Sequence, residues 1–320
     1  MIGDMQKWTP NVAGIIEHAR EIHPKTEVIS RLVSGEIHRT NYEEVCIRSR
    51  KLGSALEKDG VKKGDVVATL ALNTYRHLEM YYGISGMGAI THTLNFRLHP
   101  EQAIYIINHA EDKIIFVELP FVPILEGLQD KLATVEKYIV LCEEGEMPET
   151  SLKNAISYEE YIKDGDENYN WPELDDDAAC ALCYTSGTTG NPKGVLYSHK
   201  SNVIHAQAAL TAMTIKPDDS ILMVVPLFHV LAWGIPYFGP MNGLKLVMPG
   251  MQMEGEPLYE LIDKEDITLA FGVPTIWMGL LAYCRDNNKI LSSVKNTIIG
   301  GSALSLATLQ EFDEVHDVNV

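Results

Sequence analysis

Short apolar stretches rich in β-branched residues alternate with helix-like stretches along most of this chain. Strands separated by helices imply right-handed crossovers between parallel strands, with helices on both faces of the sheet. The first alternation comprises expected strands at 65–72, 89–94, 113–117 and 138–141 and expected helices at 74–87, 100–109 and 121–132. The sequence therefore predicts an α/β fold of layered, largely parallel sheets flanked by helices.

A second alternation begins after residue 178. Its expected strands are 179–185, 194–198, 220–225, 245–248, 268–272 and 297–299, and its expected helices are 201–213, 230–237, 257–264, 274–285 and 304–315. Near the N-terminus, 11–22 is expected to form a helix and 27–39 a hairpin. The acidic, turn-rich stretch 143–177 favours a solvated surface connector. We therefore expect a first sheet-and-helix subdomain at 1–142, this connector, and a second α/β subdomain at 178–320.

The charge balance excludes one class of partner. Asp and Glu total 44 against 26 Lys and Arg, so the formal net charge is −18. A protein that binds nucleic acid needs basic surface to replace the counterions of the phosphates, and no basic run of the needed length is present. The segment from Ser220 to Leu244 lacks charged residues, but its three prolines favour two buried elements that meet at a loop over a transmembrane helix.

The cysteines indicate a reducing compartment. The chain has five Cys, an odd number, and is too long to need disulfides for its stability. Cys180 and Cys183 have the spacing of half a zinc or redox site, but they lie in an apolar run that reads as a buried strand. We expect both thiols to serve packing. No apolar signal segment is seen between Met1 and Pro10, so the expected location is the cytoplasm.

The glycine- and threonine-rich stretch from Thr185 to Gly194 is the strongest candidate site. Its glycines allow successive backbone N–H groups to point at one anion, its hydroxyls add donors, and Lys193 adds a positive charge. Because Lys193 is followed by Gly194 and a β-branched strand, the stretch is not a Walker A loop, which ends in Gly-Lys-Ser/Thr and opens a helix. A generic turn is the alternative, and phosphate binding is the prediction.

The stretch from Tyr184 to Gly194 also resembles the signature of the adenylate-forming superfamily, which includes acyl-CoA synthetases, amino-acid adenylation domains and luciferases. Further segments resemble that family in the same order, namely Val225-Pro-Leu-Phe-His229, Gly272-Val-Pro-Thr275 and Gly300-Gly-Ser-Ala303. The segments 95–100 and 108–113 resemble the bacterial fatty-acyl-CoA synthetases, including relatives that act on short methylthio acids. The resemblance covers essentially the whole chain.

The resemblance implies an enzyme that activates a carboxylic acid, expected to be a fatty acid, with MgATP to acyl-AMP and then transfers the acyl group to the co-substrate CoA. It implies phosphate contacts from Thr185, Ser186, Gly187, Thr188, Thr189, Gly190 and Lys193, a magnesium contact from Thr185, and nucleotide contacts from Gly301, Ser302 and Ala303. It implies an acid pocket lined by His229, Val230, Trp233, Gly300 and Gly301, with His229 as the catalytic residue beside the carboxylate. The alternatives are that His229 is a structural histidine, that Trp233 is a core tryptophan, and that the segment 300–303 is a plain strand-to-helix turn.

The family pattern continues beyond the segments found here, with residues that stack on adenine, complete the magnesium shell and transfer the acyl group. The expectation is therefore that these 320 residues are the N-terminal portion of a longer ligase, with an incomplete second subdomain and no substantial activity alone. A homodimer agrees with the resembled branch. Amino-acid adenylation domains typically place an Asp shortly after the residue matching Phe228, and this chain has no Asp there. A nucleotide-binding or interaction module without catalysis, or an adenylate-former for a non-fatty carboxylate, remains the alternative.

Overall fold

The strands of the chain form two sheets. The computed structural model describes residues 8–185, 191–213 and 215–320. Within these residues a seven-stranded sheet has the order β7 (Ala155–Ser157), β6 (Lys137–Val140), β5 (Ile114–Val117), β3 (Val66–Leu70), β4 (Ile90–Thr93), β8 (Ala179–Thr185) and β9 (Lys193–Ser198). A six-stranded sheet has the order β13 (Asn296–Ile299), β12 (Leu269–Gly272), β10 (Ser220–Met223), β11 (Lys245–Met248), β1 (Glu27–Arg31) and β2 (Ile37–Asn41). The pairings are parallel except those of β1 with β2 and β8 with β9, which confirms the expected fold class.

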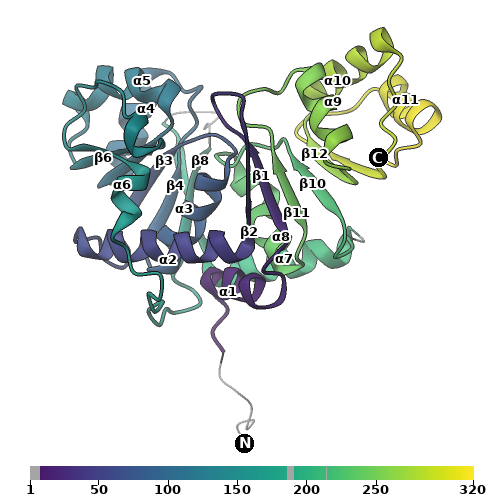
Figure 1. Ribbon diagram of the computed structural model, residues 1–320. Coiled ribbons are helices and arrows are strands. Elements are labelled where there is room, and N and C mark those ends of the chain that lie inside the picture. The colour runs from purple at the N-terminus through teal and green to yellow at the C-terminus, as the bar shows by residue number, and fades with distance from the viewer. Residues whose placement is uncertain (1–7, 186–190, 214) are drawn as a thin grey trace, which may run out of the picture.

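Helices lie between the sheets and on their outer faces (Figure 1). Those on the inner faces are α1 (Val12–Ile22), α2 (Tyr42–Lys58), α3 (Tyr75–Gly86), α6 (Tyr158–Lys163), α7 (His199–Ala212) and α8 (Ile235–Met241). Those on the outer faces are α4 (Pro100–Ala110), α5 (Val122–Leu128), α9 (Gly255–Lys264), α10 (Pro274–Asn287) and α11 (Leu306–His316). Short 3₁₀ turns cover Leu119–Phe121, Gln129–Lys131 and Glu144–Glu146, and a turn of different backbone conformation covers Val230–Gly234.

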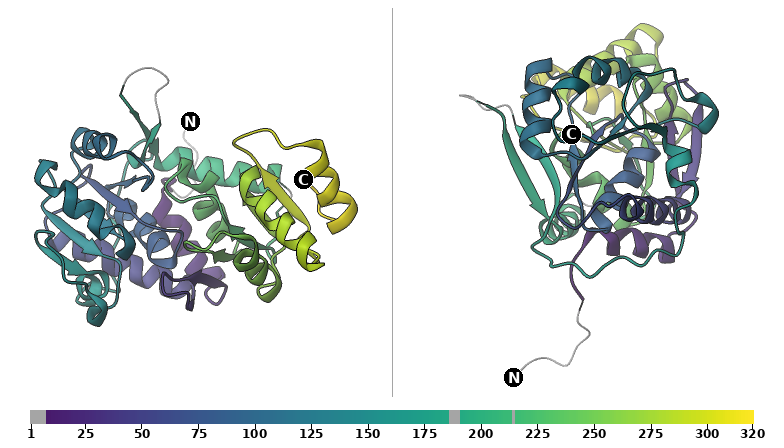
Figure 2. Two further views of the ribbon diagram at one scale, coloured as in Figure 1. Left: turned by 90° about the horizontal axis from the view of Figure 1, so that it is seen from above. Right: turned by 90° about the vertical axis from the view of Figure 1, so that its left-hand side faces the viewer.

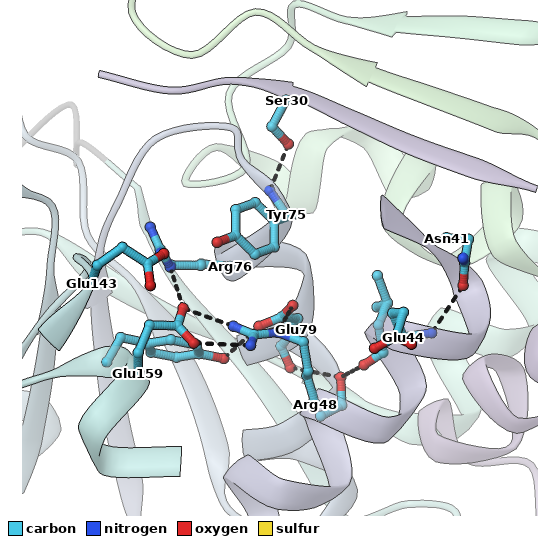
Figure 3. Close-up of polar contacts among 12 residues, drawn as sticks. Ser30, Asn41, Glu44, Arg48, Tyr75, Arg76, Glu79, Glu143 and Glu159 are labelled. Atoms are coloured by element: carbon cyan, nitrogen blue, oxygen red, sulfur yellow. Dashed lines mark hydrogen bonds and ion pairs between the residues drawn. The ribbon is translucent and has the colours of Figure 1, made fainter. Parts of the chain in front are cut away.

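Helix α3 is the centre of the molecule, because every one of its residues is buried. Its charged side chains are therefore paired. The carboxylate of Glu79 accepts hydrogen bonds from Arg48 Nε at 2.7 Å and from the Tyr158 hydroxyl at 2.8 Å. Arg48 also binds Glu159 through both terminal nitrogens at 2.9 Å, and Glu159 in turn binds Arg76 (Figure 3). We call Arg48, Arg76, Glu79, Glu143 and Glu159 the Arg48 cluster; it ties α2, α3 and α6 together.

Several sequence-based expectations need correction. Helix α2 follows β2, although no helix was expected over 42–58. The segment 143–177 is more than a solvated connector, because it adds β7 to the seven-stranded sheet and buries Tyr158 and Ile162 of α6. The expected units 1–142 and 178–320 each contribute strands to both sheets.

The remaining expectations for the core hold. All five cysteines are free and buried, including Cys180 and Cys183 of β8. The uncharged stretch from Ser220 forms buried strand β10 and, after a turn, buried helix α8. Among the described residues, none of the helices is both long and apolar enough to span a bilayer.

Candidate functional site

A cavity of about 250 Å³ opens where β4 and β8 of one sheet and the segment after β10 of the other sheet meet. Ligands commonly bind at the carboxyl ends of parallel strands, because connecting loops converge there. The lining residues are Thr93, Asn95, Leu98, Gln102, Ile106, Cys183, Tyr184, Thr185, Pro192, Tyr197, Phe228, His229 and Val230. We call this the acid cavity. It brings together Thr185 and His229, which are 44 positions apart in the sequence.

One wall of the acid cavity is a chain of polar aromatic contacts that the sequence analysis did not identify. The Tyr184 hydroxyl and His109 Nδ1 share a hydrogen bond of 2.6 Å. Burial raises the pKa of Tyr184 to about 12, so its hydroxyl stays neutral. Behind Tyr184, His92 Nδ1 lies 2.8 Å from the Asp112 carboxylate, and both residues are fully buried. These contacts fix the Tyr184 ring as a rigid part of the wall.

The segment after His229 is a left-handed turn, which corrects the helix expected at 230–237. Val230, Leu231, Ala232 and Trp233 have φ values of 47°, 51°, 47° and 56°, and the right-handed helix α8 begins only at Ile235. Left-handed helical conformation costs non-glycine residues roughly 1–2 kcal/mol each. Such strain persists only where the surrounding structure imposes it, and it concentrates at functional sites.

Buried side chains hold the segment that leads into this turn. The Asn73 amide donates to Met223 O at 2.8 Å and to Val225 O at 2.9 Å, and its oxygen accepts from Leu227 N–H at 2.8 Å. Asn73 directly follows an expected strand, so a polar residue at a sheet's carboxyl edge is the signal that could have identified it.

Two further groups act on the same segment. The Tyr81 hydroxyl donates to Leu227 O, and the Thr93 hydroxyl donates to Phe228 O at 3.3 Å. Cys183 packs behind the turn: burial raises the pKa of its thiol, while the Thr93 hydroxyl and the backbone N–H groups of the turn oppose that effect. The thiol is therefore protonated and serves packing.

A second cavity of about 330 Å³ lies on the other side of the turn. Its lining residues are Tyr197, Ser201, Asn202, His205, Val230, Leu231, Trp233 and Gly234. Val230 and Tyr197 line both cavities. Trp233 is half-buried and packs against Gly300, where an added Cβ would lie 2.9 Å from the indole ring. Gly300 therefore leaves room for Trp233, and the two predicted acid-pocket residues are in contact.

Two of the predicted phosphate-binding residues, Thr185 and Lys193, lie on the paired strands β8 and β9, which project from the body of the molecule (Figure 2). Thr185 and Lys193 are paired across the hairpin, and both are exposed. Ser186, Gly187, Thr188, Thr189 and Gly190 lie outside the described residues. Their predicted contacts with phosphate stay predictions.

The predicted nucleotide-binding segment follows β13. Gly301, Ser302 and Ala303 are exposed, and none of the three lines either of the two cavities. Gly301 has φ 88°, which only glycine adopts without strain, so a side chain is disfavoured there. The contacts predicted for this segment are not tested by the cavities.

The fit of a magnesium ion can be judged from the acid cavity. Mg²⁺ prefers carboxylate, phosphate and water oxygens in near-octahedral geometry. Thr185 offers a hydroxyl, but among the described lining residues no side chain is a carboxylate. The acidic group Asp175–Asp177 is a surface cluster that pairs with Lys200. The described residues of the acid cavity therefore do not form a magnesium site by themselves.

Comparisons with known proteins identify the family of this chain. The family profile described as AMP-binding enzyme matches residues 16–320. The chain is 43% identical over 322 residues to the medium-chain-fatty-acid–CoA ligase of Ectopseudomonas oleovorans, covering 100% of this chain and 59% of that protein. It is also 43% identical over 321 residues to the 3-methylmercaptopropionyl-CoA ligase of Ruegeria pomeroyi, covering 100% of this chain and 60% of that protein.

Solved structures show the same fold. The anthranilate CoA ligase AuaEII, solved in complex with anthranoyl-AMP, superposes with a TM-score of 0.88 at 23% identity, covering 100% of this chain and 60% of that one. A long-chain-fatty-acid-CoA ligase from Archaeoglobus fulgidus gives a TM-score of 0.85 at 22% identity, covering 99% of this chain and 64% of that one. The chain spans about 60% of the length of the two sequence relatives above. With a family profile that matches residues 16–320, this chain belongs to the family of AMP-binding enzymes.

Proposed function

We propose that this chain provides the phosphate-binding and acid-binding part of an AMP-forming acyl-CoA ligase. In the first step the carboxylate oxygen of the acid attacks the α-phosphorus of ATP, which releases pyrophosphate and forms acyl-AMP. In the second step the thiol of CoA attacks the acyl carbonyl, which releases AMP and forms the thioester. Such chemistry depends mainly on in-line positioning and on neutralising phosphate charge.

One observation carries this proposal: Thr185, at the start of the phosphate loop, and His229 line the same cavity. Lys193 faces Thr185 across the β8–β9 hairpin and is exposed, so its charge is available to a phosphate. The hydroxyl of Thr185 would donate to the phosphates, and the imidazole of His229 would donate to the acid carboxylate. Val230 and Trp233 would form the apolar wall beyond it.

The composition of the acid cavity favours an acid that is apolar beyond its carboxylate. Leu98, Ile106, Phe228 and Val230 supply apolar surface, and the described lining residues include no Asp, Glu, Lys or Arg. The ammonium group of an amino-acid substrate would be buried there without a partner, which is costly. A fatty acid therefore fits better than an amino acid.

Magnesium, location and assembly extend the proposal. Mg²⁺ would need the phosphate oxygens of ATP to complete its ligands, with Thr185 contributing at most a hydroxyl. Free, buried cysteines agree with a reducing compartment such as the cytoplasm. A homodimer is compatible with the proposal but carries no part of it.

The test is an ATP–pyrophosphate exchange and acyl-CoA assay on the protein expressed from its complete reading frame, with straight-chain acids of graded length and 3-methylthiopropionate. We expect acid-dependent exchange and CoA thioester formation. His229→Ala should lower kcat/KM for the acid by at least about 10²-fold. His99→Ala is the matched control, because His99 is exposed and lies outside both cavities.

Two results would contradict the proposal. Intact ATP binding without acid-dependent exchange, for any acid, would favour the alternative of a nucleotide-binding module without catalysis. Equal losses of kcat/KM in the His229→Ala and His99→Ala variants would show that His229 has no specific role in binding or activating the acid.

A further inference from the structure

The segment that leads into the acid cavity is held from the opposite sheet. Asn73 follows β3 of the seven-stranded sheet, whereas Met223, Val225 and Leu227 follow or end β10 of the six-stranded sheet. Asn73 is 3% exposed, and its amide makes three hydrogen bonds of 2.8 to 2.9 Å to the backbone of that segment. A side chain that satisfies three backbone groups in a buried position determines the path of the chain.

The same segment receives a second side chain from α3. The hydroxyl of Tyr81 donates to Leu227 O, so Leu227 is bound through both its N–H and its carbonyl. The left-handed turn begins three residues later, at Val230. Since that turn contains no glycine before Gly234, the local sequence does not favour its conformation, and tertiary contacts must select it.

We propose that Asn73, assisted by Tyr81, is a positioning residue that holds His229 and the left-handed turn in the conformation that binds the carboxylic acid. This inference rests on the proposed function. Asn73 does not line either cavity and acts only through the backbone of the segment from Met223 to Leu227. Its loss changes how often the turn is formed.

The expected effect follows from population arithmetic. If only a fraction of molecules holds the binding-competent turn, the apparent dissociation constant rises by the reciprocal of that fraction. A competent fraction of 1–10% in Asn73→Ala therefore raises KM for the acid about 10- to 100-fold. Tyr81→Phe keeps the ring and removes one hydrogen bond, so a smaller rise of about 3- to 10-fold is expected. KM for ATP changes less than about two-fold in both variants, because the hydrogen bonds described for Asn73 and Tyr81 go to the segment before His229 and not to β8 or β9.

Tyr42→Phe is the matched control. Tyr42 is fully buried, and its hydroxyl donates to a backbone carbonyl, Leu244 O, at 2.5 Å, as that of Tyr81 does to Leu227 O. The Tyr42 contact lies before β11 and does not touch the segment that leads to His229. A loss of stability common to both tyrosine variants therefore reports packing, and only a change in KM for the acid reports positioning.

A second readout does not depend on turnover. Cys183 is 4% exposed and lies behind the turn, whereas Cys142 and Cys284 are buried elsewhere. The rate at which a maleimide labels each thiol in the folded full chain can be followed by mass spectrometry. In Asn73→Ala we expect labelling of Cys183 to accelerate at least about ten-fold relative to Cys142 and Cys284.

Each outcome decides one point. Selective labelling of Cys183 together with a raised KM for the acid supports the inference. Unchanged or non-selective labelling in a folded Asn73→Ala protein overturns it, as does an unchanged KM for the acid or an equal rise in KM for ATP. Selective labelling in a protein that activates no carboxylic acid before substitution rejects the proposed function while leaving the control of the turn by Asn73 intact.

Discussion

Replacing Arg48 should produce a large, pH-dependent loss of stability. Arg48 Nε lies 2.7 Å from Glu79 Oε1, and the Glu79 side chain is fully buried. Arg48→Met keeps much of the side-chain volume but leaves Glu79 without its cationic partner. Removing one member of a buried ion pair typically costs about 3–5 kcal/mol, because the remaining charge stays desolvated. We expect a decrease in the free energy of unfolding of that size at pH 7.5.

The pH dependence distinguishes a buried charge from lost packing. Burial raises the pKa of Glu79 above its ordinary value, although Arg48 opposes this effect. The folded state therefore keeps the Glu79 proton to higher pH than the unfolded state does, so ionisation of Glu79 reduces stability as pH rises. Without Arg48 the pKa of Glu79 rises further. The loss of unfolding free energy in Arg48→Met should therefore grow by up to about 1.4 kcal/mol per pH unit between pH 5 and 7.5.

The assay is urea unfolding followed by tryptophan fluorescence, with free energies from linear extrapolation. Arg48→Met combined with Glu79→Gln should recover at least about 2 kcal/mol of the sum of the two single losses, because the buried charge is then gone. Lys153→Met is the control, since Lys153 and Asp130 form a 3.2 Å pair with side chains 69% and 88% exposed. Its free energy of unfolding should equal that of the parent protein within error. A loss for Arg48→Met below about 1 kcal/mol, or one independent of pH, would refute the reasoning.

Further predictions concern glycines and a buried histidine. Gly83→Ala should lower the free energy of unfolding by about 1–3 kcal/mol, because the new methyl would lie 2.7 Å from a leucine side chain of α2. Gly279→Ala, where nothing lies within 4 Å of the added Cβ, should raise it by about 0.5–1 kcal/mol in the same urea assay, because alanine favours helix α10 more than glycine does. Gly250→Ala should cost about 2 kcal/mol or more, since φ is 62° and the Cβ would lie 2.3 Å from the Arg31 carbonyl oxygen; a normal unfolding midpoint would contradict this. Burial lowers the pKa of His199 to about 4, so the stability contributed by its neutral form is present above pH 6.5 and is lost as pH falls towards 4. His199→Gln should therefore reduce the slope of unfolding free energy against pH in this range by up to about 1.4 kcal/mol per pH unit. An identical slope would contradict the lowered pKa of His199.

Local sequence predicted most strands and helices because their signals are local. Runs of β-branched residues marked β3 and β5, an apolar run marked β10, and proline marked the start of α4. Helix α2 also carried a local signal that was overlooked: Asn41 caps it by accepting from Glu44 N–H, an arrangement typical of helix starts.

Features that depend on distant contacts could not be read from the sequence. The pairing of β1 with β11 joins residues more than 200 positions apart, and no local pattern specifies it. The left-handed turn is the clearest case at the site, because Val230, Leu231 and Ala232 favour right-handed or extended backbone. The segment that leads into it is bound by Asn73, which follows β3 of the other sheet. The motif predicted a candidate site, but not the left-handed shape of the turn after His229.

The proposed site can be tested most directly by a crystal structure of the protein with a decanoyl sulfamoyl adenosine, a stable mimic of acyl-AMP. We predict that the acyl carbonyl lies beside His229, that the alkyl chain contacts Val230, and that the linker to adenosine lies beside Thr185. An analogue bound away from the acid cavity, with the residues of that cavity unoccupied and unchanged, would contradict it.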